Sequence, residues 1–279
     1  PAAGGYRSEN EGYMHACGHD AHAAIGVGVL DAVLAGGFSG TLKLCFQPAE
    51  ELGAGGDAMV RSGHLDDVDH LLAVHVGLDH PTGEIVAGVE GFLAVTGFDV
   101  TFRGESAHAG GHPAQGRHAL GAAATATTQL HATPRHEDGA TRINVGRIEG
   151  GTASNVVPDR ADLEAEVRGE TTELMEYMWE HARRIVRSAA STHGCEAEIE
   201  RGSHAPSAES DADLAAVVAD AAGATAGVTS LLDRDDLGRS EDATYLMPRV
   251  VQRRGSRGSH GVATCHPAVP PPPPSRTLP

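Results

Sequence analysis

The sequence is poor in lysine and short of positive charge. Lys43 is its only lysine, and 38 acidic residues against 21 lysines and arginines give a formal net charge of −17. Proteins that bind nucleic acid need a basic face to neutralise phosphates, so this balance argues against nucleic acid as the main partner. A small anionic substrate remains compatible with it, because one arginine can override the average field locally.

Paired cysteines and long apolar runs are also missing. The four cysteines, Cys17, Cys45, Cys195 and Cys265, are widely spaced and form no CxxC motif, which argues against a disulfide scaffold. The apolar runs are far shorter than the roughly 20 residues of a membrane-spanning helix. The opening stretch PAAGGYRSENEGY lacks the apolar segment of a secretion signal. We therefore expect a cytoplasmic protein with no membrane partner.

The residues that are present favour a folded α/β protein. Hydrophobic residues make up 40% of the 279 residues, which supports a real core. Residues 23–37 have the pattern of a buried helix, and residues 41–46 and 70–76 have the pattern of strands. This alternation predicts a parallel-rich sheet with flanking helices.

The pattern changes near residue 94. Between 94 and 203 the signals follow the order β-α-β-β-α-β, which predicts an inserted ferredoxin-like α+β domain. Helical sequence returns over 204–250, so 1–93 and 204–250 are assigned to one domain. Periodicity then ends, and 251–279, with its run of five prolines, is predicted to be a disordered Pro-rich tail.

The stretch GYMHACGHDAH, residues 12–22, raises the first question of chemistry. Cys17 and His19 flank Gly18, and a glycine allows a tight loop to direct both side chains to one point. Thiolate and imidazole are good ligands for transition metals. A buried cysteine beside a helix start explains the same residues equally well.

Two later segments change this balance. Glu50 and Glu51 follow the predicted strand 41–46, and His75 lies at the end of the predicted strand 70–76. Alone, these are explained by an acidic helix start and a structural histidine. In open α/β sheets, however, sites form beyond the carboxyl ends of strands. With Glu50 as a general base, the combination suits metal-assisted hydrolysis. The candidate ligands are Cys17, His19, Glu51 and His75.

Three residues of the predicted insert have two interpretations each. His108 follows the first strand of the insert and has the chemistry to donate a hydrogen bond to a developing oxyanion, but it also suits a surface loop. Arg168 suits a substrate carboxylate or a surface ion pair. Asn155, in TASNVVPD, is equally open.

Six segments in this order resemble the M20 metallopeptidase family, specifically its amidohydrolase branch: MHACGHDAH, FQPAEE, AVHVG, SAHAG, GGTASNVVPD and RSED. Longer stretches, such as INVGRIEGGTASNVVPDRADLEAEVRG and SEDATYLM, are most similar to the aminobenzoyl-glutamate hydrolases of that branch. The similarity covers about residues 12 to 250. It implies a catalytic domain with a two-metal site and an inserted lid domain that also dimerises.

The resemblance also implies roles and partners. It implies Mn²⁺ or Zn²⁺ as the metal, two ions per complete site, and Glu50 as the base. His108 of a partner subunit would polarise the scissile carbonyl, while Asn155 and Arg168 would hold the substrate carboxylate. The implied reaction is hydrolysis of the amide bond of p-aminobenzoyl-glutamate or a related N-acyl amino acid. The implied assembly is a homodimer or a hetero-oligomer with a related subunit. The metal ligands it implies are Cys17, His19, Glu51 and His75.

The sequence departs from the family pattern at both ends. The family has an RxDxDALP motif before MHACGHD and a GHHN segment near its end, and neither is present. We therefore expect a truncated chain that diverges after about residue 250. An alternative function is an inactive M20-like fragment that keeps the dimerisation domain as an interaction module. A thiol redox protein using Cys17 would need a resolving cysteine, which the spacing does not supply. An SH3-type ligand in the proline run would lie beyond the family pattern.

Overall fold

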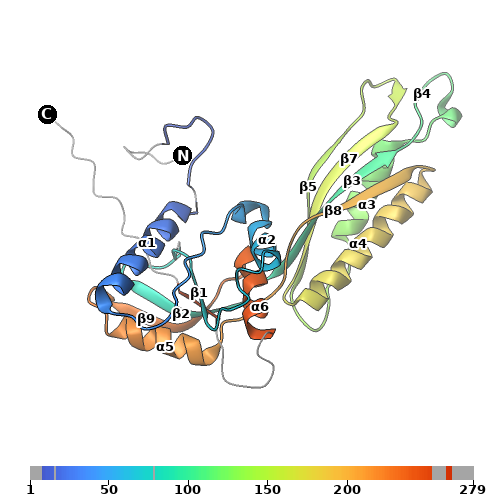
Figure 1. The fold of residues 1–279 in the computed structure, drawn as a ribbon. Helices are drawn as coiled ribbons and strands as arrows, with labels where there is room; N and C mark the ends of the chain where they lie inside the picture. Colours follow the sequence, from blue (N-terminus) through green and yellow to red (C-terminus); the bar gives the residue numbers. More distant parts are fainter. Residues whose placement is uncertain (1–7, 16, 78, 253–261, 266–279) are drawn as a thin grey trace.

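The computed structural model describes residues 8–15, 17–77, 79–252 and 262–265. Its elements form two parts of different architecture (Figure 1). The four-stranded part is an antiparallel sheet with two helices. The parallel part contains short parallel strands and the remaining helices. The chain begins in the parallel part, passes through the four-stranded part and then returns.

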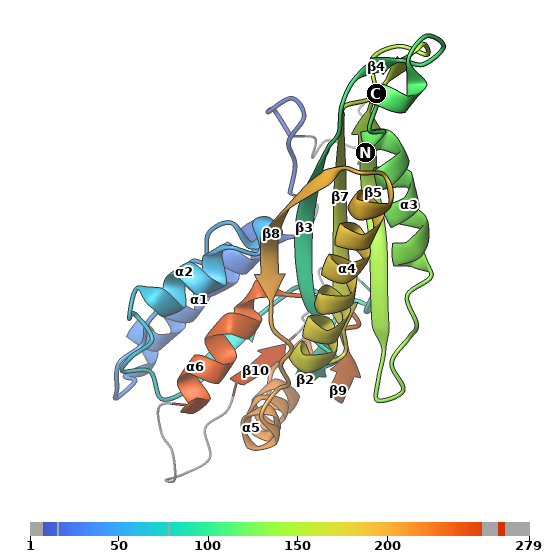
Figure 2. The same cartoon turned by 90° about the vertical axis from the view of Figure 1, so that its right-hand side faces the viewer.

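The four-stranded part has the strand order β5-β7-β3-β8, with every neighbouring pair antiparallel. Helices α3 and α4 pack on each other and cover the same face of the sheet (Figure 2). Along the chain the elements follow the β-α-β-β-α-β order that the sequence predicts. They are β3 (Ala94–Arg103), α3 (Ala119–His131), β5 (Thr141–Gly150), β7 (Arg160–Gly169), α4 (Thr172–Thr192) and β8 (Glu196–Ala205).

The core of the four-stranded part is the largest in the described structure. Side chains alternate across a strand, and β3 therefore buries Phe98, Val100 and Phe102 toward the helices. Helix α4 adds Met178 and Val186 from one face, at helical spacing. At one end of the sheet, β4 (Ala107–His108) pairs with β6 (Val156–Val157) beside the 3-10 helix η2 (Pro113–Gln115). This end points away from the parallel part (Figures 1 and 2).

The parallel part contains two parallel strand pairs. β1 (Leu71–Val74) pairs with β10 (Val262–Cys265), and β2 (Glu84–Glu90) pairs with β9 (Ser230–Asp236). Small apolar clusters hold it together, one around Phe92 and Met247 and another around Leu65 and Leu246. Its helices are α1 (His19–Gly36), α2 (Gly55–Arg61), α5 (Ala212–Gly223) and α6 (Leu246–Gln252), with 3-10 helices η1 (Glu50–Leu52) and η3 (Asp242–Tyr245).

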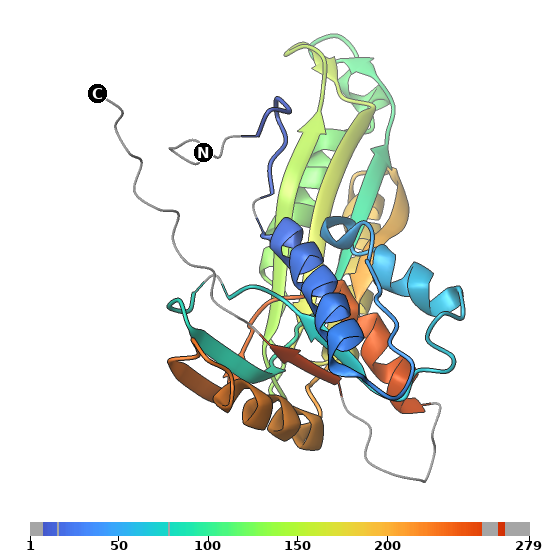
Figure 3. The same ribbon diagram turned by 60° about the vertical axis from the view of Figure 1, so that its left-hand side comes forward.

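Two expectations for the N-terminal region are wrong. Residues 41–49 form neither helix nor strand, although 41–46 alternates like a strand. Helix α1 is present, but it has no buried residue, and Val27 and Leu34 are 51% and 74% exposed. It lies on the outside of the parallel part (Figure 3). A strand needs a neighbouring ladder and an apolar helix face needs a covering element, and the described residues supply neither here.

Two further differences concern strands. β2 and β9 are absent from the sequence-based expectation, because charged residues at their ends interrupt the apolar pattern. The predicted disordered tail 251–279 contains β10, while 253–261 and 266–279 lie outside the described residues. No helix in the described part of the chain combines the length and apolar character needed to cross a bilayer.

Candidate metal centre

The candidate site begins where the chain enters α1. Gly18 has φ +80°, a backbone conformation that glycine adopts without penalty. Its α-carbon also faces Val76 so closely that a β-carbon would lie 2.5 Å from Val76 Cγ2. This close approach places Cys17 and His19 beside the residue that follows β1, which is His75.

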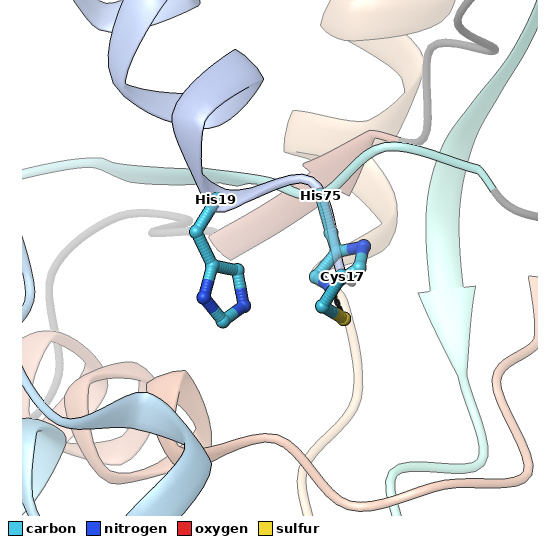
Figure 4. A group of neighbouring side chains, drawn as sticks. All are labelled: Cys17, His19 and His75. Carbon is cyan, nitrogen blue, oxygen red and sulfur yellow. Dashed lines mark hydrogen bonds between the residues drawn. The ribbon is translucent and has the colours of Figure 1, made fainter. Parts of the chain in front are cut away.

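Cys17, His19 and His75 form one group of possible ligands. Their side chains extend to the same side of the backbone, below the start of α1 (Figure 4), and one donor atom of each lies within 4.8 Å of the others. Cys17 Sγ lies 3.4 Å from His75 Nε2. His75 Nδ1 lies 2.8 Å from the carbonyl oxygen of Val76, which only accepts, so Nδ1 carries the proton. The lone pair of Nε2 therefore faces Cys17, and this arrangement is typical of metal-ligating histidines.

Glu50 and Glu51 complete the set of predicted residues in the parallel part. They begin η1, directly after Ala49, whose φ of +53° is unusual for a residue other than glycine. His19 Nε2 lies 3.5 Å from Glu50 Oε2 and 3.9 Å from Glu51 Oε1. His19, Glu50 and Glu51 form a second group whose donor atoms lie within 4.8 Å of one another. His19 therefore joins the thiol-imidazole group to the carboxylates.

The donor atoms fit a divalent metal. His19 Nε2 is buried and has no hydrogen-bond partner among the described residues, although it points at two carboxylates. A buried nitrogen without a partner carries a free-energy penalty, and a metal would remove it. Thiol, imidazole and carboxylate are together the ligands of zinc and of related transition metals.

The electrostatics of Cys17 argue against a redox thiol. Burial raises its pKa, and the negative charges of Glu51 and Glu50 raise it further. Reactive cysteines instead have lowered pKa values. A bound cation would reverse the effect, because metal coordination deprotonates a thiol.

Three residues of this region have no role in the sequence analysis. The first is His22, whose pKa is lowered to about 4 by burial and then by His75 and His19. Its ring is therefore neutral, and Nε2 accepts a 3.0 Å hydrogen bond from the N–H of Val76. His22 thus fixes α1 against the end of β1.

The other two residues are Glu241 and Asp242 at the start of η3. One oxygen of each lies within 4.8 Å of an oxygen of Glu50. Burial and the charge of Glu50 raise the pKa of Glu241 to about 8. These residues lie in RSED, one of the segments on which the family resemblance rests, so the available signal was the motif itself.

His108 and Asn155 lie far from this cluster. His108 is on β4, and its neighbour Ala109 donates a 2.9 Å hydrogen bond to the carbonyl oxygen of Asn155. The β4–β6 pair is at the end of the sheet away from α1 (Figures 1 and 2). The N–H groups of Gly110 and Gly111 donate to His108 Nδ1 at 3.2 and 2.9 Å. In a neutral ring, Nε2 of this exposed residue therefore carries the proton.

Arg168 is the third predicted residue of the insert. It is on β7, and its guanidinium makes two hydrogen bonds to Glu166, at 2.8 and 3.0 Å. A third, 3.3 Å long, reaches Ser240 Oγ, one residue before Glu241. The structure thus brings together Cys17, His19, Glu50, Glu51 and His75. It separates His108 and Asn155 from them within one chain, and it links Arg168 through Ser240 to the segment that carries Glu241.

Comparison with known proteins gives a consistent result. The family model described as peptidase family M20/M25/M40 matches residues 1–269. An indole-3-acetyl-aspartic acid hydrolase of Enterobacter agglomerans is 44% identical over 90% of this chain. One of the subunits of the p-aminobenzoyl-glutamate hydrolase of Escherichia coli is 42% identical over 91% of it. The chain spans 58% and 59% of the length of these two relatives.

Solved structures agree with the sequence relatives. An aminobenzoyl-glutamate utilization protein from Klebsiella pneumoniae superposes with a TM-score of 0.79 at 41% identity, covering 87% of this chain and 62% of that one. A dinuclear metal binding peptidase of the M20 family from Bacillus subtilis superposes with a TM-score of 0.66 at 25% identity. That match covers 92% of this chain and 65% of the other.

Proposed function

Because this chain belongs to peptidase family M20/M25/M40, we propose that it is a metal-dependent amidohydrolase. We propose p-aminobenzoyl-glutamate or a related N-acyl amino acid as its substrate. The observation that carries the proposal is the convergence of Cys17, His19 and His75 on Glu50 and Glu51. Two similar proteins carry names of hydrolases acting on acylated acidic amino acids, which supports this substrate class. The cytoplasmic location expected from the sequence stays a prediction.

The metal ligands in this proposal are the four predicted ones. Cys17, His19 and His75 supply sulfur and nitrogen donors. Glu51 supplies a carboxylate oxygen that lies near Nε2 of His19. Thiolate and imidazole donors suit Zn²⁺, and carboxylate oxygens suit Mn²⁺, so this mixed set keeps both metals as candidates. Two ions per complete site is the family expectation, and the B. subtilis relative is described as dinuclear. When bound, the metal supplies Lewis acidity and lowers the pKa of water.

Glu50 is assigned the role of general base. Its carboxylate lies 3.5 Å from His19 Nε2, and its side chain is only 24% exposed. A carboxylate within reach of the substrate water is a suitable acceptor for its proton. A Glu50 oxygen would take the proton of the attacking water and pass it to the leaving nitrogen.

His108 and Asn155 are assigned to the active site of a second subunit. They lie together, but at the end of the four-stranded part that is remote from the metal ligands. With Nδ1 held by two backbone N–H groups, His108 offers the Nε2 proton to a substrate oxygen. Such a donor stabilises a developing oxyanion. Arg168 is assigned to the substrate carboxylate, which would have to compete with Glu166 for the guanidinium.

The first test compares Glu50→Gln with the unchanged protein. Hydrolysis of p-aminobenzoyl-glutamate, measured with added Mn²⁺, should fall by about 10²- to 10⁴-fold, because the base is lost. The Zn²⁺ content per chain should stay nearly unchanged, since Glu50 is not among the proposed ligands of the centre formed by Cys17, His19, Glu51 and His75. His75→Ala should lower the metal content, and Glu198→Gln, on the exposed side of β8, is the matched control for both measurements.

Equal turnover in Glu50→Gln would remove Glu50 as the base. Absence of both metal and turnover in the unchanged protein would contradict the proposal as a whole. That result would favour the inactive M20-like fragment, with the four-stranded part retained for interaction.

A further inference from the structure

A second group of possible ligands lies beside the proposed metal centre and consists only of carboxylates. Glu50, Glu241 and Asp242 each present an oxygen within 4.8 Å of the other two. Glu50 comes from η1, and the other two come from the start of η3, almost two hundred residues later in the chain. The group contains no thiol and no imidazole, so its chemistry differs from that of Cys17, His19 and His75.

Asp242 provides independent evidence for a ligand at this group. Its side chain is only 2% exposed. One oxygen, Oδ2, accepts a buried 2.9 Å hydrogen bond from the N–H of Gly56. The other oxygen, Oδ1, is buried and has no hydrogen-bond partner among the described residues. Buried carboxylate oxygens are normally satisfied. The unsatisfied Oδ1 therefore indicates that a cation or a hydrogen-bond donor binds here.

The surrounding charges do not supply that partner. In the described part of the chain, neither Glu241 nor Asp242 contacts a lysine or arginine in an ion pair, and Glu50 lies 3.5 Å from His19 Nε2. Arg239 pairs with Asp79, and Arg168 pairs with Glu166. Three carboxylates that are close together and partly buried repel one another unless a cation or a proton lies between them.

The ligand atoms indicate which cation fits. Carboxylate oxygens are hard ligands, which Ca²⁺ and Mg²⁺ prefer over sulfur or nitrogen. Oxygens on opposite sides of a Ca²⁺ ion, each at about 2.4 Å, are separated by about 4.8 Å. The three oxygens lie within 4.8 Å of one another, so one Ca²⁺ ion between them would reach all three. Water would complete the coordination shell, as it commonly does at such sites.

We propose that Glu50, Glu241 and Asp242 form a separate binding site for a hard divalent cation, next to the Cys17–His19–His75 centre. One consequence rests on the proposed function. A cation at this site engages Glu50 and removes it from its role as base, so high Ca²⁺ should inhibit hydrolysis. The binding itself does not depend on whether the protein is an enzyme.

The test is a calorimetric titration with Ca²⁺ of protein already loaded with Zn²⁺. Ca²⁺ binds poorly to thiolate and imidazole, so it reports on the carboxylate site. The unchanged protein should bind one Ca²⁺ per chain. Glu241→Gln and Asp242→Asn should each weaken the affinity by about tenfold or more, because each removes one ligand charge. Asn at 242 keeps an acceptor for the Gly56 N–H, and circular dichroism checks the fold of both variants.

Two controls separate this site from its neighbour. Glu198→Gln changes the net charge by the same amount away from the group and should leave Ca²⁺ binding unchanged. Cys17→Ala should reduce Zn²⁺ content while Ca²⁺ binding persists. Absence of Ca²⁺ binding in the unchanged protein, or equal affinity in Glu241→Gln and Asp242→Asn, would overturn the proposal.

Discussion

At the scale of single residues, the backbone at Gly18 controls the geometry of the metal centre. Two constraints coincide there, a φ of +80° and a van der Waals contact with Val76 that leaves no space for a β-carbon. Either constraint alone disfavours any other residue. Because Cys17 and His19 are its direct neighbours, a shift of the backbone at Gly18 moves both donor atoms.

Gly18→Ala is therefore expected to weaken metal binding. A misplacement of ligands typically lowers metal affinity by about 10- to 100-fold, and the strained backbone should cost about 1–3 kcal/mol in the free energy of unfolding. Equilibrium dialysis with Zn²⁺ and thermal unfolding of the metal-free protein measure the two effects. Gly28→Ala is the matched control, since Gly28 lies within α1 and a β-carbon there would meet no atom within 4 Å outside the helix backbone. Unchanged Zn²⁺ affinity in Gly18→Ala would contradict this account.

At the scale of elements, β8 and η3 form one of the contacts between the two parts. Tyr245, the last residue of η3, donates a 2.6 Å hydrogen bond from its hydroxyl to the carbonyl oxygen of His204 on β8. The two rings lie 5.8 Å apart in an edge-on arrangement. Burial, and then the charge of Arg201, lower the pKa of His204. The folded protein thus holds His204 in its neutral form.

The lowered pKa of His204 should make the free energy of unfolding depend on pH. The unfolded chain binds a proton at His204 near the ordinary pKa of about 6.5, and the folded chain binds it only at lower pH. The contribution of neutral His204 is therefore complete above about pH 6.5 and is lost as the pH falls toward the lower folded pKa. His204→Gln should reduce the slope of unfolding free energy against pH in this window, measured by urea unfolding. Tyr245→Phe removes the hydroxyl but keeps His204, and it should retain the slope. The same slope in His204→Gln would show that other groups cause it.

At the scale of the whole molecule, the proposed catalytic groups lie at opposite ends of the folded structure of one chain. The metal ligands and Glu50 are in the parallel part, and His108 is at the far end of the four-stranded part. An assembly of two chains with twofold symmetry would bring such groups together reciprocally. In a mixed dimer of two differently disabled chains, one of the two sites then contains both Glu50 and His108.

Complementation between two inactive variants tests this arrangement. Glu50→Gln and His108→Ala should each be inactive alone. Equal mixing with exchange of subunits makes half of the dimers mixed, and half of their sites are intact, so about a quarter of the original activity should return. Hydrolysis of p-aminobenzoyl-glutamate measures the recovery, and differently tagged chains confirm that mixed dimers form. Mixed dimers without recovered activity would place His108 outside the partner's site.

Local patterns were sufficient for much of the fold. The β-α-β-β-α-β order of the four-stranded part follows from alternation in β3 and from the apolar stripe of α4. These patterns are reliable because the sheet and its helices bury one another, so every element finds its partners within residues 94–205. The predicted strand at 41–46 and the predicted burial of α1 were wrong. A strand needs a neighbouring strand and an apolar helix face needs a covering element, and the described residues provide neither at these positions.

The candidate site was only partly predictable for a similar reason. The residue types at Cys17, His19, Glu50, Glu51 and His75 indicated metal chemistry, because few other functions need that combination. Glu241 and Asp242 were missed, since two acidic residues at a helix start look ordinary in a sequence with so many of them. Only the return of the chain from β8 to η3 places them beside Glu50.

The sequence by itself determined which candidate donor side chains this protein carries and the family to which their order belongs. Side-chain chemistry is a local property, so a motif is enough to establish it. The tertiary structure alone decided which donors share a site. It grouped the thiol, the imidazoles and the carboxylates around His19, and it placed His108 at the other end of the molecule. Distances between segments far apart in the chain depend on how strands pair and helices pack, and no local pattern encodes them.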